Sequence, residues 1–182
     1  VAITDLTTIV RNKDIQNFIL KISNSVRVST NIKELYKDIF ENLRILIPTQ
    51  NFTISLLVDD NYIEEYNYST KKDVSSNRKK IKSNIIEPLI KTRRSLSYNE
   101  EEIEYLKEKN KLNKTFKTPK SYIASPLIIT EEIIGAISIK SFDNKNLYGD
   151  KYLAILKFIS DQIAMAIDKV KSVEEMHYLA YY

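Results

Sequence analysis

The sequence contains no cysteine and only one histidine, His177. Without cysteine it offers no disulfide, no thiolate metal ligand, no nucleophilic thiol and no thioether bond to a tetrapyrrole. A single histidine near the C-terminal end cannot form a histidine-based metal cluster or a buried catalytic pair with an acid. We therefore expect no catalytic residues, no metal and no cofactor, and leave room only for an unidentified small-molecule ligand.

Long apolar runs are also missing. No stretch approaches the roughly 20 apolar residues of a membrane-spanning helix, and the first residues lack the basic segment and apolar core of a secretion signal. We expect a soluble, cytoplasmic protein with no direct membrane insertion. Because the chain begins at Val1 and ends on Tyr182 without an obvious stop, we also expect it to be a segment of a longer protein.

The composition is otherwise ordinary for a globular protein. Of the 182 residues, 43% are hydrophobic and 29% are charged, which suits one domain that buries about two-thirds of its unfolded surface. The net charge of +4 is mild, and the main basic cluster, residues 71–82, contains no aromatic residue. Nucleic-acid grooves usually pair such charge with stacking aromatics, so we expect a solvated loop here and no nucleic-acid partner.

Helical periodicity is present at both ends of the chain. Residues 15–26 and 32–47 carry apolar side chains with the spacing of one helix face, and each segment is predicted to be a helix. Asn31 with Glu34 resembles a capping box at the start of the second helix, and Pro48 ends it. After a polar loop at residues 143–149, helical spacing returns and holds to the end of the chain.

Between these helices, four segments are predicted to be strands paired as two hairpins, because they are rich in β-branched or aromatic residues and are bounded by polar turns. Glu64 lies among three tyrosines on one face of its strand, which predicts a partly wet edge strand. Gly135 predicts a close backbone approach or a bulge. The predicted strands are residues 51–58, 62–68, 121–129 and 133–140.

The segment between the hairpins is predicted to contain only short elements. Residues 69–83 are polar and basic and are predicted to be a loop. A short helix, a short strand and an acidic helix follow, the last beginning after Asn99. Its consecutive glutamates diverge around the helix, so we expect no acid pair for catalysis. Marginal elements of this kind commonly form the wall and lid of a pocket beside a rigid sheet.

The final helix has an apolar stripe wider than a surface helix needs. Part of the stripe steps by four, three, four and three residues, which is the spacing of a coiled-coil seam. We expect this seam to pair with a second copy of the chain and to couple it to other domains. The alternative is that the whole stripe belongs to the core. The seam residues are Ile159, Ile163, Ala166, Val170 and Val173.

Several of these segments together resemble the GAF domain family. The resemblance rests on three segments in this order: Ser121-Tyr-Ile-Ala-Ser-Pro-Leu-Ile-Ile, Ile134-Gly-Ala-Ile-Ser-Ile and Ile159-Ser-Asp-Gln-Ile-Ala-Met-Ala-Ile. The resemblance covers about residues 15–171 and implies an α+β fold. It implies a central antiparallel sheet of five or six strands, with the N- and C-terminal helices on one face and a ligand pocket under variable short helices and loops on the other.

The resemblance also implies a role in signalling. Residues 1–14 are then an N-terminal extension, residues 15–171 a sensor domain, and residues 172–182 a helical connector. The connector, Val173-Glu-Glu-Met-His-Tyr-Leu-Ala-Tyr-Tyr, resembles the segment that precedes a diguanylate cyclase (GGDEF) domain, the producer of cyclic di-GMP in bacteria. We expect a covalently linked output domain of this kind and a homodimer formed through the terminal helices.

Some activities of the family do not fit this sequence. Bilin attachment and free methionine sulfoxide reductase activity both need cysteine, and haem ligation would need a histidine in the domain body. Ser141-Phe-Asp-Asn-Lys lacks the signature that usually accompanies cyclic nucleotide binding. The alternatives to a sensor of a cyclase are a ligand-free structural dimerisation module, or the sensor of a histidine kinase or transcription regulator.

Six side chains are the candidates for lining the implied pocket. They are small polar or tyrosine side chains on the predicted strands, and each could instead serve ordinary sheet packing or point to solvent. The candidates are Thr53, Ser55, Tyr66, Tyr98, Tyr122 and Ser138.

Overall fold

The computed structural model describes residues 2–29, 31–72 and 74–182. Among them, no helix combines enough length with enough apolar character to cross a bilayer. In chain order the elements are α1 (Ala2–Val28), α2 (Ile32–Leu46), β1 (Asn51–Leu57), β2 (Tyr62–Ser69), β3 (Ser75–Lys80), α3 (Glu87–Thr92), β4 (Leu96–Asn99), α4 (Glu100–Glu108), β5 (Ser121–Ile129), β6 (Glu132–Ser141) and α5 (Asp150–Tyr181).

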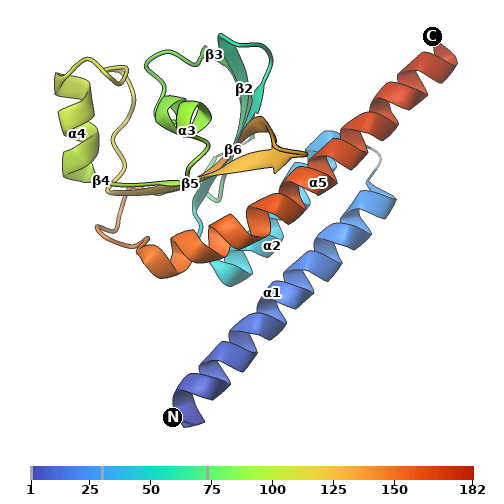
Figure 1. Cartoon of the computed structure of the whole chain (residues 1–182), viewed down its shortest axis with the longest axis horizontal. Helices are drawn as coiled ribbons and strands as arrows, with labels where there is room; N and C mark the ends of the chain where they lie inside the picture. Colours follow the sequence, from blue (N-terminus) through green and yellow to red (C-terminus); the bar gives the residue numbers. More distant parts are fainter. Residues whose placement is uncertain (1, 30, 73) are drawn as a thin grey trace.

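The strands form one six-stranded sheet in the order β3-β2-β1-β6-β5-β4, with antiparallel pairing throughout. The predicted hairpins are β1–β2 and β5–β6, and the pairing of β1 with β6 joins them into a continuous sheet. The expected α+β architecture is confirmed, with six strands (Figure 1).

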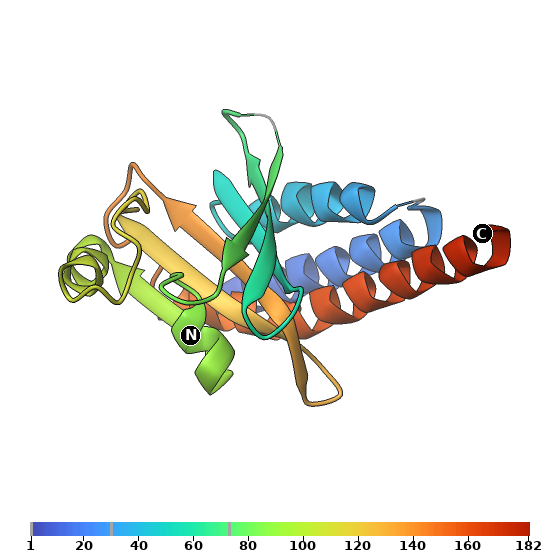
Figure 2. The same cartoon turned by 90° about the horizontal axis from the view of Figure 1, so that it is seen from above.

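Helices α2 and α5 lie on one face of the sheet, and α1 packs against both of them. Figure 2 shows the three helices running alongside one another behind the sheet. The main core lies between these helices and the sheet, where each large apolar side chain removed from water contributes about 1.5–3 kcal/mol. Its members include Phe18, Ile22, Leu35, Ile39, Leu43, Phe52, Ile54, Ile123, Leu127, Ile137, Ile139, Leu156 and Ile167.

The opposite face of the sheet carries the variable segment with α3 and α4 (Figure 1). Apolar side chains from this segment pack on small residues and on Tyr122 of the sheet and form a second core. Asn99 and Glu102 form the capping box that begins α4. The second core consists of Ile63, Ile81, Ile85, Ile86, Leu89, Ile103, Leu112, Tyr122, Ala124 and Ala136.

At Gly135 the backbone of β6 comes close to that of β1. A Cβ atom added at this position would lie 2.1 Å from the main-chain oxygen of Ser55 and 3.0 Å from the Cα atom of Leu56. Both are backbone atoms that cannot turn away, so only glycine fits. The predicted close approach at Gly135 is confirmed.

The structure corrects the prediction of a loop over residues 69–83. Ser75–Lys80 form β3, which pairs with β2 and makes the sheet edge that had been assigned to β2. All six residues of β3 are exposed, so neither face carries the apolar alternation by which strands are detected. At the N-terminal end, α1 begins at Ala2, so residues 2–14 continue the first helix.

Candidate functional site

Five of the six candidate pocket residues lie on the sheet face opposite the long helices. Thr53 pairs with Ser138, and Tyr98 pairs with Tyr122, so each pair shares a face. Ser55 pairs with Ala136, a member of the second core. The alternation of side chains along neighbouring strands is what brings these residues together.

Tyr66 is the exception, and its placement corrects the prediction of one shared surface. It pairs with Ile54, whose side chain belongs to the main core, and its ring centroid lies 4.9 Å from that of Tyr36 in α2. Burial, followed by a hydrogen bond to Glu64, raises the pKa of Tyr66 to about 12. Tyr66 therefore packs under the helices and is separated from the other candidates by the sheet.

The space above the five remaining candidates is filled by side chains. Tyr122 is 1% exposed and Ser55 is 2% exposed, and burial raises the pKa of the Tyr122 hydroxyl. Thr53 donates a hydrogen bond from Oγ1 to Oδ1 of Asn67 over 2.8 Å. None of the six candidates lines any of the four cavities described below.

The largest of these cavities, with a volume of about 560 Å³, lies on the same face but nearer the edge strands. It is enclosed by β3, the segment leading into α3, the segment after α4 and the end of β6. Five lysines and one carboxylate line it, and we call it the lysine cavity. Its walls are Glu65, Lys79, Lys80, Lys82, Ser83, Asn84, Ile85, Leu112, Asn113, Thr115, Phe116, Lys117, Lys140 and Phe142.

The one carboxylate of the lysine cavity already has partners. Glu65 is 7% exposed, and its Oε2 atom lies 2.6 Å from Nζ of Lys79. Its Oε1 atom accepts a hydrogen bond from Nδ2 of Asn84 over 3.2 Å. One lysine and one amide therefore bond to the only acid among the described wall residues, and none of the other four lysines forms an ion pair with it.

Lys140 is the partly buried lysine of the cavity. Among the described residues, no carboxylate lies within ion-pair distance of its Nζ atom, and burial lowers the pKa of this ammonium group. Its Nζ atom lies 6.0 Å from the ring centroid of Phe116. Across the cavity, Nζ of Lys117 lies 4.3 Å from the ring centroid of Phe142. Sequence reasoning missed Lys140, although its alternation with Ala136 and Ser138 along a buried strand was the available signal.

A second cavity, of about 320 Å³, adjoins the lysine cavity. The two share Lys117, Lys140 and Phe142, and the second one extends along the β1–β2 hairpin to Lys71 and Lys72. Lys71 pairs with Asp143 at 3.6 Å. A lysine-rich surface thus continues from one cavity into the next.

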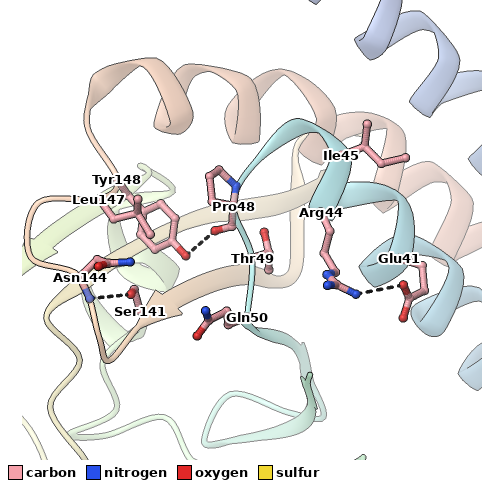
Figure 3. Close-up of a pocket in the computed structure, with 10 residues that line it drawn as sticks. All are labelled: Glu41, Arg44, Ile45, Pro48, Thr49, Gln50, Ser141, Asn144, Leu147 and Tyr148. Atoms are coloured by element: carbon pink, nitrogen blue, oxygen red, sulfur yellow. Dashed lines mark hydrogen bonds and ion pairs between the residues drawn. The ribbon is translucent and has the colours of Figure 1, made fainter. Parts of the chain in front are cut away.

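A third cavity lies on the other side of the sheet end, below the C-terminal end of α2 (Figure 3). It measures about 470 Å³, but its polar groups bond to one another. Arg44 pairs with Glu41 at 3.3 Å, and the Tyr148 hydroxyl donates to the Pro48 carbonyl over 2.7 Å. The main-chain amide of Asn144 donates a hydrogen bond to the Ser141 hydroxyl over 3.2 Å. A fourth, of about 310 Å³, lies beside α5. The charged residues that line the fourth cavity, Asp168, Lys171 and Glu175, are of both signs, unlike the lysines of the lysine cavity.

The predicted coiled-coil seam lies mostly inside the domain, which corrects its expected availability to a partner. Ile159, Ile163, Ala166 and Val170 are buried in the main core, and Val173 alone is substantially exposed, at 48%. Helix α5 packs on the sheet and on two helices at the same time. This packing within the domain requires apolar residues at the same spacing as a coiled-coil seam.

The far part of α5 is attached to the domain by Glu174. Its Oε1 atom accepts a hydrogen bond from the main-chain amide of Ile32, at the first turn of α2, over 2.7 Å. A carboxylate at this position also interacts favourably with the positive end of the α2 dipole. From Glu175 to Tyr182 every residue is exposed, so Glu174 marks the last anchor of α5.

A family model described as GAF domain matches residues 29–168, which is well over half of the chain. The chain therefore belongs to the GAF domain family. GAF domains are regulatory sensing domains of signalling proteins. No curated protein sequence matches this chain. Among the described residues, no group of three or more His, Cys, Asp or Glu side chains is placed to hold a metal ion.

Solved structures agree with this fold at low sequence identity. The GAF domain of a phosphoenolpyruvate-protein phosphotransferase from Coxiella burnetii has a TM-score of 0.70 at 12% identity, covering 90% of this chain and 98% of that one. The phycoerythrobilin-bound GAF domain of a cyanobacterial phytochrome has a TM-score of 0.65 at 15% identity, and the match covers 88% of this chain and 97% of that one. Residues 122 to 287 of a methyl-accepting chemotaxis protein have a TM-score of 0.66 at 14% identity, and the match covers 84% of this chain and 98% of that one.

Proposed function

We propose that this chain is the small-molecule-sensing domain of a bacterial signal-transduction protein and is not itself an enzyme. The observation that carries the proposal is the lysine cavity, which lies between the sheet and the short elements of the variable segment. A ligand held there contacts both the rigid sheet and the segment that covers it. Only a difference in ligand affinity between two arrangements of the domain can act as a signal.

The route for the signal is α5. It begins beside the sheet, packs on β5 and on both other long helices, and continues past its last anchor at Glu174. We propose that it controls a covalently linked diguanylate cyclase, because residues 173–182 resemble the connector to that domain. A histidine kinase or a transcription regulator as the output is the alternative.

Thermal denaturation of the chain in a metabolite library tests the sensor proposal. We expect at least one small molecule to raise the Tm by several degrees, since a ligand that binds only the folded state stabilises it in proportion to occupancy. If no compound raises the Tm, the domain is not a small-molecule sensor.

The output is tested by the residues that follow Tyr182 in the full-length protein. We expect Asp-x-Leu-Thr-Gly and then a Gly-Gly-Asp/Glu-Glu-Phe signature. A histidine-kinase or helix-turn-helix pattern in that position contradicts the cyclase assignment.

A ligand-free dimerisation module is the second candidate, and exposed apolar side chains on α5 favour it. Phe158, Met165 and Met176 are 60%, 57% and 68% exposed, and their spacing places them within about 20° of one line along the helix. We propose that a second copy of the chain packs on this stripe. Sedimentation should show a dimer that Phe158→Glu with Met165→Glu converts to a monomer, whereas a monomeric unmodified chain at high concentration contradicts pairing.

A further inference from the structure

The lysine cavity has a strong imbalance of charge. Within the described part of the chain, Lys79 alone of its five lysines has a carboxylate partner, Glu65, which lies 2.6 Å from it and is the one described acid in the wall. Among the described residues, Lys80, Lys82, Lys117 and Lys140 make no ion pair. Four of the five cationic groups around this cavity therefore lack an ion-pair partner among the described residues, and Glu65 acts on Lys140 only at longer range.

Lys140 makes this imbalance significant. The Lys140 side chain is partly buried, and an ammonium group with reduced access to water and no ion-pair partner is costly. The lowered pKa of Lys140 reports that cost. A methionine or leucine would fill the same place on β6, beside Tyr122 and Asn51, without it. A partly buried cation that lines a cavity and has no ion-pair partner among the described residues is expected where a ligand supplies the counter-charge.

The side walls add a second property to the site. Phe116 and Phe142 both line the cavity, and both are partly exposed. Each lies beside a lysine, Phe116 near Lys140 and Phe142 near Lys117. The cavity therefore offers apolar contact to the carbon skeleton of a ligand together with cations for its acidic groups. Its volume of about 560 Å³ lies in the range typical of small-molecule sites.

We propose that the lysine cavity binds a small organic anion carrying more than one negative charge, with Lys140 and Lys117 as its cationic contacts. This inference rests on the proposed sensor function and specifies the ligand class. Carboxylate and phosphate groups share the required chemistry, because both accept charge-assisted hydrogen bonds from ammonium groups. A cavity of this size, lined from both the sheet and the loops, suits a small ligand.

The probes are citrate, a polycarboxylate, and inorganic pyrophosphate, a polyphosphate, each compared with sodium chloride at equal ionic strength. We expect one or both to raise the Tm of the wild-type chain beyond the effect of salt, and the stronger of the two identifies the acidic group. Calorimetric titration with that probe then gives its Kd. Failure of both probes to stabilise the chain beyond chloride overturns the proposal.

Lys140→Met is the decisive variant, because it changes two observables in opposite directions. Without ligand its Tm should be equal to or above that of the wild type, since a partly buried charge with no ion-pair partner is removed. Its Kd for the probe should rise about tenfold or more. Lys157→Met, on the exposed face of α5, is the matched control and should keep the wild-type Kd. A Kd for Lys140→Met equal to that of wild type overturns the proposal.

Lys117→Met keeps the test valid if Lys140→Met does not fold, because Lys117 is exposed at the rim and its removal leaves the core intact. The Kd of Lys117→Met for the probe should also rise severalfold, and an unchanged Kd overturns the role assigned to Lys117. The outcomes separate this inference from the sensor proposal. If a neutral metabolite stabilises the wild type and Lys140→Met equally, sensing stands and the anion class is wrong; if nothing stabilises either chain, both are wrong.

Discussion

Gly135 lies in the β1–β6 pairing that joins the two hairpins, so its replacement should have a large effect. Gly135→Ala places a methyl group against the main-chain oxygen of Ser55. Relieving that contact requires separation of β1 and β6, and we expect a loss of at least about 2 kcal/mol in the free energy of unfolding. Gly149→Ala is the control, because a Cβ there meets nothing within 4 Å, and it should cost under about 1 kcal/mol. Urea denaturation of both variants measures the difference.

Buried tyrosines give the domain a sensitivity to alkali. Burial raises the pKa of Tyr68 to about 12, against an ordinary value of 10.0. A group whose pKa is raised in the folded state contributes stability that is complete below its unfolded pKa and lost as pH rises through the folded pKa. We therefore expect the free energy of unfolding to fall between pH 10 and about pH 12.

Tyr68→Phe tests this assignment, because phenylalanine cannot ionise. The variant loses only a long hydrogen bond, from the Tyr68 hydroxyl to the Lys33 carbonyl at 3.4 Å. At pH 8 we expect a small difference from wild type, and above pH 10 that difference should shift in favour of the variant. Denaturation curves at a series of pH values measure it, and parallel pH profiles would contradict the assignment.

For single residues, the sequence predicted which face of the sheet a side chain occupies better than it predicted which side chains it contacts. Alternation correctly put Thr53, Ser55 and Ser138 together, because the period of a strand is local. The prediction for Tyr66 was wrong because its hydroxyl suggested a polar pocket residue, whereas its aromatic ring packs well under a helix. Lys140 went unnoticed because an isolated lysine at the end of an apolar strand looks like a solvated terminus until the loops above it are known.

Among the elements, α2 and α5 are joined near their ends by one side chain. Glu174→Ala removes the acceptor for the Ile32 amide and should cost about 1–2 kcal/mol, because hydrogen bonds to charged groups contribute about this much. Hydrogen exchange should quicken in the first turn of α2 and in the end of α5. Glu175→Ala, one residue along on the exposed side, is the control and should leave both exchange patterns unchanged.

Elements with an apolar face were predicted and those without one were missed. α2 and both hairpins carry strong periodicity, and α4 has a capping box, so local signals define them. β3 has no buried residue and exists only because β2 offers it an unpaired edge. The seam in α5 was misassigned for a related reason, since helical spacing tells that a face is covered but not by what.

For the whole molecule, we expect the domain to fold without its last residues. Every side chain from Glu175 to Tyr182 is exposed, so a chain ending at Glu175 keeps all of the anchors described above. Its Tm should lie within about 2 °C of the full chain, a shift that corresponds to less than about 1 kcal/mol at this size. A markedly lower Tm would mean that the tail packs on the domain or on a second copy.

The architecture as a whole could be predicted because the order of elements, two helices, a hairpin, a variable segment, a hairpin and a long helix, is distinctive by itself. The cavity could not. Its position depends on how far Ile81, Ile85 and Leu112 fill the space over the sheet, and that packing decides whether the open volume lies over the centre or the edge. Side-chain volumes in loops carry no periodic signal in sequence.

α5 extends for 32 residues without a break, from the sheet to well past Glu174. A regular helix advances about 1.5 Å and turns about 100° with each residue. Anything attached to its end is consequently fixed in angle as well as in distance. Adding one residue beyond Glu174 would swing an attached domain by more than a quarter of a turn, while adding seven would return it almost to its starting angle. Natural relatives that share this helix should therefore differ in its length by steps of about seven residues.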